Sequence, residues 1–117
     1  MAYVEGFVLA VPTANQATFL RHAREAAVLF KEFGATRVVE CWGDDVPDGT
    51  LTDFRRAVKA EPDETIVFSW IEYPSREARD AAHARMQADP RMQDMGRDMP
   101  FDGRRMILGG FAPILDT

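Results

Sequence analysis

An amphipathic helix between two apolar, strand-like runs dominates the first third of the chain. Residues Tyr3 to Val11 are almost all apolar, which is typical of a strand covered on both faces, and Pro12 ends this run. A capping box over Thr13–Gln16 begins the helix, and Gly34 is suited to end it. Between them, apolar residues recur at steps of three and four and form one stripe: Phe19, Ala23, Ala26, Ala27, Phe30 and Phe33.

The rest of the chain continues this order of strands and helices. A polar segment over residues 44–63, with a short helix over 53–60 capped by Thr52, separates the second strand from the third. Residues 91–96 predict one loose turn, and Gly109 and Gly110 predict a bend in the last strand or the close approach of another backbone. The other expected elements are strands over 36–43, 65–73 and 104–114, and a helix that begins after Ser75 and ends near Asp89.

This order of elements indicates an α+β, ferredoxin-like fold. In the βαββαβ arrangement, a four-stranded antiparallel sheet carries two long helices on one face, with the extra short helix between strands 2 and 3. Alternation along the strands predicts that the other face bears Phe7, Trp42, Phe68 and Trp70. A monomer would leave this apolar patch in water, so we expect a homodimer that joins through the open sheet face.

Length and charge narrow the classes of function. A chain of 117 residues is expected to form one domain over residues 1–117. The net charge of −5 argues against a nucleic-acid partner, because most basic residues have acidic neighbours in the sequence. Cys41 is the single cysteine, and no apolar run is long enough for a signal peptide or a membrane span. We therefore expect a cytoplasmic protein with no membrane partner.

A candidate ligand site follows from the same alternation. Glu40 and Trp42 share one face of the second strand, and Trp70 and Glu72 share one face of the third. A carboxylate in an aromatic cleft has a shifted pKa and can act as a general base on an acidic C–H or a phenol, so Glu40 is the base candidate. Arg105 could hold an anionic substrate or enolate through two hydrogen bonds. The structural alternative is that Glu–Arg salt bridges between sheets or subunits fix the dimer.

Four segments carry a resemblance to a known family: Glu40–Pro47, Thr52–Phe54, Phe68–Trp70 and Met99–Met106. They resemble the bacterial YbaA-like proteins, a family of unknown function, and the similarity spans essentially the whole chain. The resemblance implies the dimeric α/β barrel superfamily, in which two ferredoxin-like sheets face each other. That superfamily includes cofactor-independent oxygenases, haem-degrading oxygenases and lactone isomerases, so the resemblance narrows the fold more than the function.

His83 is a second catalytic candidate through this resemblance. The haem-degrading members use a helix-borne histidine near a tryptophan of the third strand and an asparagine on the first strand. This chain has His83 and Trp70 in the first two places, but its expected first strand has no asparagine. The alternative is a partly solvated histidine on the helix flank and a tryptophan that packs. No cofactor is expected.

Two further residue groups have a structural and a functional interpretation. Asp44, Asp45 and Asp48 lack the glycine and the distal glutamate of a calcium loop, so they predict a turn and no metal site. The methionine-rich segment is either adaptable packing or a soft wall to a pocket; it comprises Met86, Met92, Met95, Met99 and Met106. The 44–63 segment would be a lid over one barrel end or an arm exchanged with a partner subunit.

Two functions remain open from the sequence. The first is a small-molecule site in the barrel cleft, with binding alone or with cofactor-independent oxygenase or isomerase chemistry on an aromatic or enolisable compound. The second is a non-enzymatic homodimer that serves as a binding or scaffold module and whose cleft is filled by side chains. An apolar cavity of a few hundred Å³ with a convergent carboxylate would favour the first.

Overall fold

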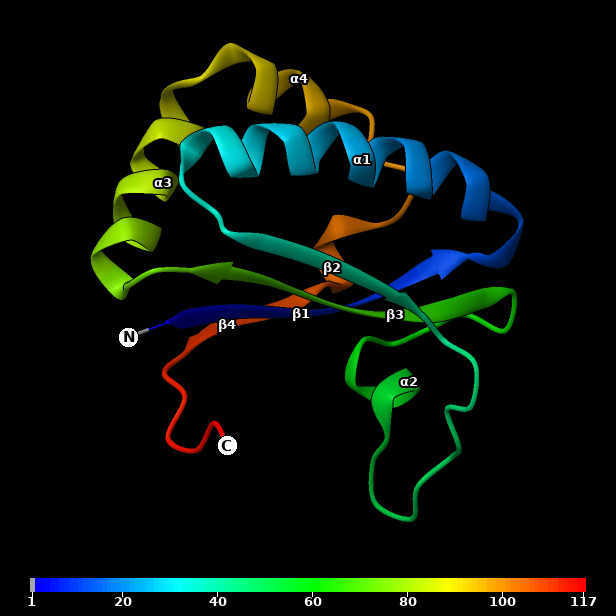
Figure 1. The fold of residues 1–117 in the computed structure, drawn as a ribbon. Helices are drawn as coiled ribbons and strands as arrows, with labels where there is room; N and C mark the ends of the chain where they lie inside the picture. The colour runs from blue at the N-terminus through cyan, green and yellow to red at the C-terminus, as the bar shows by residue number, and fades with distance from the viewer. Residues whose placement is uncertain (1) are drawn as a thin grey trace.

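The computed structural model describes residues 2–117, which form a four-stranded antiparallel sheet with helices on one face (Figure 1). The strand order is β2-β3-β1-β4, so the two most apolar strands are the inner ones. This arrangement confirms the predicted ferredoxin-like α+β fold. The strands are β1 (Tyr3–Pro12), β2 (Arg37–Trp42), β3 (Glu64–Tyr73) and β4 (Ile107–Phe111).

The helices α1, α3 and α4 lie above the sheet, while α2 with its long loop and the C-terminal end lie below it (Figure 1). Residues 90–97 form a regular helix where the sequence predicted only a loose turn. The Asp89 carboxylate accepts the backbone N–H of Arg91, and Pro90 occupies the first helical position, which is a favourable start. The helices are α1 (Gln16–Phe33), α2 (Phe54–Ala57), α3 (Arg76–Ala88) and α4 (Pro90–Arg97).

Side-chain caps differ from the prediction at two helix starts. The predicted capping box at Thr13 is wrong, because its hydroxyl lies 2.7 Å from the hydroxyl of Thr65 at the start of β3. The cap of α2 is Asp53 and not Thr52, since the Asp53 carboxylate accepts the backbone N–H of Arg56. Ser75 caps α3 as predicted. The cap at the end of α1 is confirmed as well: Gly34 has a φ of 128°, in the region that favours glycine.

Strand register assigns the side chains of the sheet to its two faces. Phe7 and Glu40 are both paired with Ser69, so these three side chains share the face that the helices cover. Phe68 and Trp70 flank Ser69 in β3 and therefore point to the open face. The helix-covered face thus holds the Ser69 hydroxyl and the Glu40 carboxylate among apolar neighbours, with the buried Glu5 carboxylate further along β1.

Trp42 and Phe7 lie on the helix-covered face, so the prediction that they share the open face with Phe68 and Trp70 is wrong. The Trp42 ring packs against Phe19 of α1, with ring centroids 6.3 Å apart. The error has a physical reason. Strand β1 is apolar on both faces, so its residue pattern does not indicate which of its faces the helices cover.

Arg105 fixes the end of the long loop to the sheet. Its guanidinium donates to both carboxylate oxygens of Glu64, each over 2.7 Å, and to the backbone carbonyl of Lys59 over 2.9 Å. Its Nε–H donates to Asp102 over 3.2 Å. Glu64 is buried, and the Arg105 guanidinium lowers the pKa of its carboxyl. None of the helices described over residues 2–117 has the length and apolar composition needed to span a membrane.

The substitution Arg105→Ala should lower the free energy of unfolding by several times the effect of Arg104→Ala, because it leaves the buried Glu64 carboxylate with the backbone N–H of Glu61 and without its cation. Arg104→Ala is the matched control: the Arg104 side chain is 91% exposed and pairs only with Asp102 among the described residues, so its loss should change stability by less than about 0.5 kcal/mol. Denaturant unfolding at neutral pH measures both. Equal effects of the two variants would contradict the anchoring role.

The ion pair between Arg105 and Glu64 also makes the stability of the protein depend on pH. The pKa of Glu64 is lower in the folded state than in the unfolded state. The ionised carboxylate therefore adds to the free energy of unfolding above the ordinary glutamate pKa of about 4.3, and this gain is lost as the pH falls through the pKa of the folded state. The stability difference between wild type and Arg105→Ala should therefore shrink on acidification below about pH 4.

Candidate ligand-binding site

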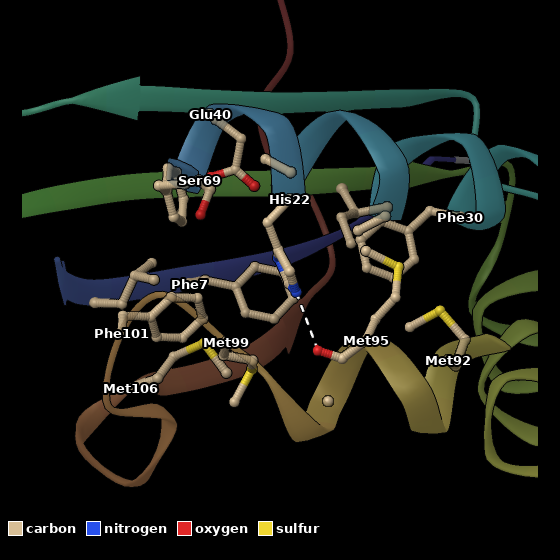
Figure 2. Close-up of a pocket in the computed structure, with 16 residues that line it drawn as sticks. Phe7, His22, Phe30, Glu40, Ser69, Met92, Met95, Met99, Phe101 and Met106 are labelled. Carbon is tan, nitrogen blue, oxygen red and sulfur yellow. Dashed lines mark hydrogen bonds between the residues drawn. The ribbon is translucent and has the colours of Figure 1, made fainter. Parts of the chain in front are cut away.

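An apolar cavity of about 260 Å³ lies between the sheet and the helices α1 and α4 (Figure 2). Its floor is the helix-covered face of the sheet: Phe7 and Leu9 from β1, Glu40 from β2, and Ser69 and Ile71 from β3.

The cavity exists because α1 presents small side chains to the middle of this floor. Ala23 and Ala26 line the space, and the bulky Phe19 and Phe30 lie one turn to either side of them on the same helix face. Ser69, directly below, is also small. The apolar stripe that predicts α1 thus packs against the sheet at its two ends and leaves room between them.

Methionines form the wall on the side of α4. Met92, Met95 and Met99 follow one another at steps of three and four, and all three line the cavity together with Met106. Of the two interpretations of this segment, the soft wall to a pocket describes these four residues. Met86, on α3, packs instead against the buried core around Tyr73.

Glu40 places a carboxylate at the edge of the cavity. Strand β2 is an edge strand, so Glu40 keeps contact with solvent, while the apolar atoms around its carboxyl group remove part of its water and raise its pKa. The hydroxyl of Ser69, paired with Glu40 across the strands, acts in the opposite direction and favours the charged form. The result is a carboxylate that is a stronger base than an ordinary surface glutamate.

His22 links the two helices that enclose the cavity. Its Nε2 lies 3.0 Å from the backbone carbonyl of Met95 (Figure 2). Because a carbonyl oxygen can only accept, this ring nitrogen carries the proton and donates it. Met95 lies in the last turn of α4, where carbonyl groups have no partner within the helix, so His22 satisfies one of them and holds α4 over the cavity.

The structure does not bring the sequence-predicted site residues together. Of the six, Glu40 is the one that lines the cavity, and Trp42 packs beside it on Phe19. Trp70 and Glu72 lie on the open face, where the indole N–H of Trp70 donates to Glu72 over 2.9 Å. The remaining two, Arg105 and His83, make ion pairs outside the lining.

His83 belongs to a charged cluster under α3. The buried carboxylate of Glu5 accepts from His83 Nε2 over 3.0 Å and from the Arg79 guanidinium over 3.0 Å. Burial and the charge of Glu5 raise the pKa of Tyr73 to about 12. Gly110 lies beside this cluster, and a side chain there would overlap the side chains of Tyr3 and Arg79, so the groups that approach this glycine are side chains and not the predicted second backbone.

Sequence reasoning missed two polar residues of the cavity. His22 lies three residues after Phe19 and so falls on the apolar helix stripe, where a lone histidine gives no signal that it lines a cavity. Ser69 becomes visible only once the register pairs it with Glu40, and a sequence does not show register directly. Among residues 2–117, no group of three or more His, Cys, Asp or Glu side chains is arranged to hold a metal ion.

Comparison with known proteins identifies the family. The chain belongs to the family described as "Protein of unknown function (DUF1428)", which matches residues 2–103. It is 62% identical over 116 residues to "Uncharacterized protein YbaA" of Escherichia coli strain K12, and the match covers 99% of each chain. These findings confirm the resemblance seen in the sequence.

Two solved structures share the fold. SnoaB, a cofactor-independent oxygenase from Streptomyces nogalater, superposes with a TM-score of 0.63 at 13% identity and covers 98% of this chain and 95% of its own. A dimeric ferredoxin-like protein from an uncultured marine organism superposes with a TM-score of 0.59 at 10% identity, over 100% of both chains. At these identities the likeness shows the fold alone.

The raised pKa of Glu40 predicts that Glu40→Gln stabilises the protein at neutral pH. The pKa of Glu40 is higher in the folded state than in the unfolded state. The protonated carboxyl therefore adds to the free energy of unfolding below about pH 4.3, and this gain is lost as the pH rises through the pKa of the folded state. Denaturant unfolding at pH 4 and pH 7 should therefore show that the free energy of unfolding of Glu40→Gln, relative to that of wild type, is higher at pH 7 than at pH 4. Glu25→Gln, on the exposed side of α1, should change stability by less than about 0.5 kcal/mol at both.

A pH titration of the Glu40 carboxyl, followed by carbon-13 NMR, tests directly how Ser69 affects its pKa. Ser69→Ala should raise the pKa of the Glu40 carboxyl further, because it removes the hydroxyl that favours the charged form. A downward shift in this variant would contradict the assignment.

Proposed function

We propose that this member of the DUF1428 family binds a small, largely apolar molecule in the cavity between the sheet and the helices, and that Glu40 accepts a proton from it. The observation that carries the proposal is an apolar space of about 260 Å³ with one base of raised pKa at its edge. An apolar pocket with a few convergent polar groups and a perturbed carboxyl is the usual composition of a ligand site.

The chemistry that fits this arrangement is proton abstraction from a phenol or an enolisable C–H. The Glu40 carboxylate takes the proton, and the electron pair of the broken bond delocalises over the ligand as a phenolate or enolate. Return of the proton from Glu40 to a different carbon completes an isomerisation. Alternatively, the anion adds O₂ at carbon to give a peroxide anion, which takes the proton back from Glu40 as a hydroperoxide, and loss of water from that hydroperoxide leaves a carbonyl group and completes an oxygenation. The fold shared with SnoaB supports the second course by analogy.

A second observation favours a partner for the open face. Phe68 is 46% exposed there, and Phe54 from the long loop packs against it with ring centroids 6.2 Å apart. Ile107 and Phe111 of β4 extend the same exposed apolar surface. The partner is a second copy of this chain, which supplies an equal apolar surface. The likeness to a dimeric protein of this fold supports that assignment.

The homodimer and the ligand site are compatible, because they use opposite faces of one sheet. A non-enzymatic dimer that binds its ligand without turnover remains the alternative function. The two differ in one readout: an enzyme consumes its ligand and a binding module returns it unchanged.

A thermal-shift screen of phenols, quinones, flavins and haem tests the ligand site. A ligand at about one hundred times its Kd stabilises the folded state by about 2.7 kcal/mol, which raises the Tm by roughly 10 °C. Ala26→Leu is the test variant, because its larger side chain extends into the cavity. It should abolish the ligand-induced shift and raise the free energy of unfolding by up to about 2 kcal/mol through added apolar burial.

The matched control is Ala17→Leu, on the exposed surface at the start of α1. It should leave both the Tm and every ligand-induced shift within error of wild type. If no compound raises the Tm of wild type, or if hits shift Ala26→Leu equally, the cavity is not the binding site.

Sedimentation velocity at micromolar concentration tests the dimer. Wild type should sediment at twice the 13.2 kDa of the chain, and Phe68→Asp should sediment as a folded monomer because it places a charge on the open face. Leu20→Asp is a matched control, since Leu20 is also 46% exposed but lies on α1. A monomeric wild type, or equal dissociation by both variants, would contradict the proposed interface.

A further inference from the structure

We infer that the ligand of the cavity is an uncharged compound of about two fused rings that carries a single hydrogen-bond donor on one edge. This inference rests on the proposed function and names the class of molecule that the site takes. The donor edge lies at Glu40 and Ser69, and the apolar edge lies against the methionines of α4.

The size of the cavity sets the size of the ligand. An engineered cavity of about 150 Å³ lined by apolar side chains holds one benzene ring. The cavity here is about 260 Å³, which is roughly 1.7 times as large, so it holds two fused rings. A compound of three fused rings requires the methionine wall to move outward.

The charges around the cavity exclude an anionic ligand. None of the described residues that line it is Lys or Arg. Arginines on and around the helices and loop that enclose it are already paired: Arg91 with Glu32 and Asp89, Arg97 with Asp94, and Arg105 with Glu64. A carboxylate or phosphate on the ligand would face the Glu40 carboxylate, and His22 is the one described lining residue that could carry a positive charge, so repulsion between like charges would oppose binding.

The polar lining atoms gather on one side and set the ligand's orientation. Figure 2 shows Glu40 and Ser69 together on the sheet, with the sulfurs of Met92, Met95 and Met99 on the side of α4. His22 Nε2–H is already donated to Met95, so Glu40 is the free acceptor. Thioether sulfurs make favourable contacts with aromatic rings, which suits a flat aromatic body against α4.

Three naphthalenes of the same size separate these requirements. 2-Naphthol carries a donor, 2-methoxynaphthalene has the same oxygen without its hydrogen, and 2-naphthoate carries a negative charge. Calorimetric titration of wild type near pH 7.5 should give about tenfold tighter binding of 2-naphthol than of 2-methoxynaphthalene, and still weaker binding of 2-naphthoate. In the ring series, 2-naphthol should bind more tightly than both phenol and 2-anthrol.

The substitution Glu40→Gln should change the affinities for two ligands in opposite directions, whereas a loss of structure would weaken the binding of both. The preference for 2-naphthol over 2-methoxynaphthalene should fall several-fold, because the neutral amide is a weaker acceptor than a carboxylate. At the same time, 2-naphthoate should bind more tightly than it does to wild type, since the repelling charge is gone. Met99→Ala, which enlarges the α4 side, should bring the affinity for 2-anthrol up to that for 2-naphthol.

The outcomes separate this inference from the proposed function. If 2-naphthoate binds wild type as tightly as 2-naphthol does, or if Glu40→Gln changes neither preference, the donor assignment is overturned while binding in the cavity stands. If none of the naphthalenes binds although the thermal-shift screen gives hits that Ala26→Leu removes, the size and class are overturned. If the screen also gives no hits, the proposed function fails with it.

Discussion

The packing of α1 on the sheet determines what the rest of this structure can do. Ala23 and Ala26 face the sheet between the larger Phe19 and Phe30, so the middle of the helix leaves a space above Ser69. This apolar space of about 260 Å³ is open to solvent on one side, so a ligand could enter it and restore the packing contacts that the small side chains leave unmade.

Two side chains hold α4 against α1. Arg91, at the start of α4, donates to Glu32 of α1 and to Asp89, which ties the two helices together on the outside. His22 ties the other end of α4 to α1 from within. Because His22 also lines the cavity and its charge lowers the pKa of Glu40, the residue that attaches α4 also acts on the carboxylate of the site.

The sequence was sufficient for the fold and insufficient for the site, and the reasons are physical. Order of elements, Ser75 as a cap and Gly34 as a helix end depend on local chemistry, which the sequence shows directly. Which face of β1 the helices cover depends on register, and an apolar strand does not show it. Glu40 was identified because alternation along the strand places its carboxylate on the same face as Trp42. Arg105 was ambiguous because its partner, Glu64, lies far along the chain.

Strand β3 connects the two proposed roles of the sheet. Ser69 points into the cavity, while Phe68 and Trp70 on either side of it point to the open face. A second copy packed against Phe68 and Trp70 would hold the backbone of β3 rigid and so hold the Ser69 hydroxyl beside Glu40. Since that hydroxyl favours the charged carboxylate, association at the open face would also fix the basicity of Glu40. In this arrangement the partner subunit affects the site only through the backbone of β3 and contributes no residue to it.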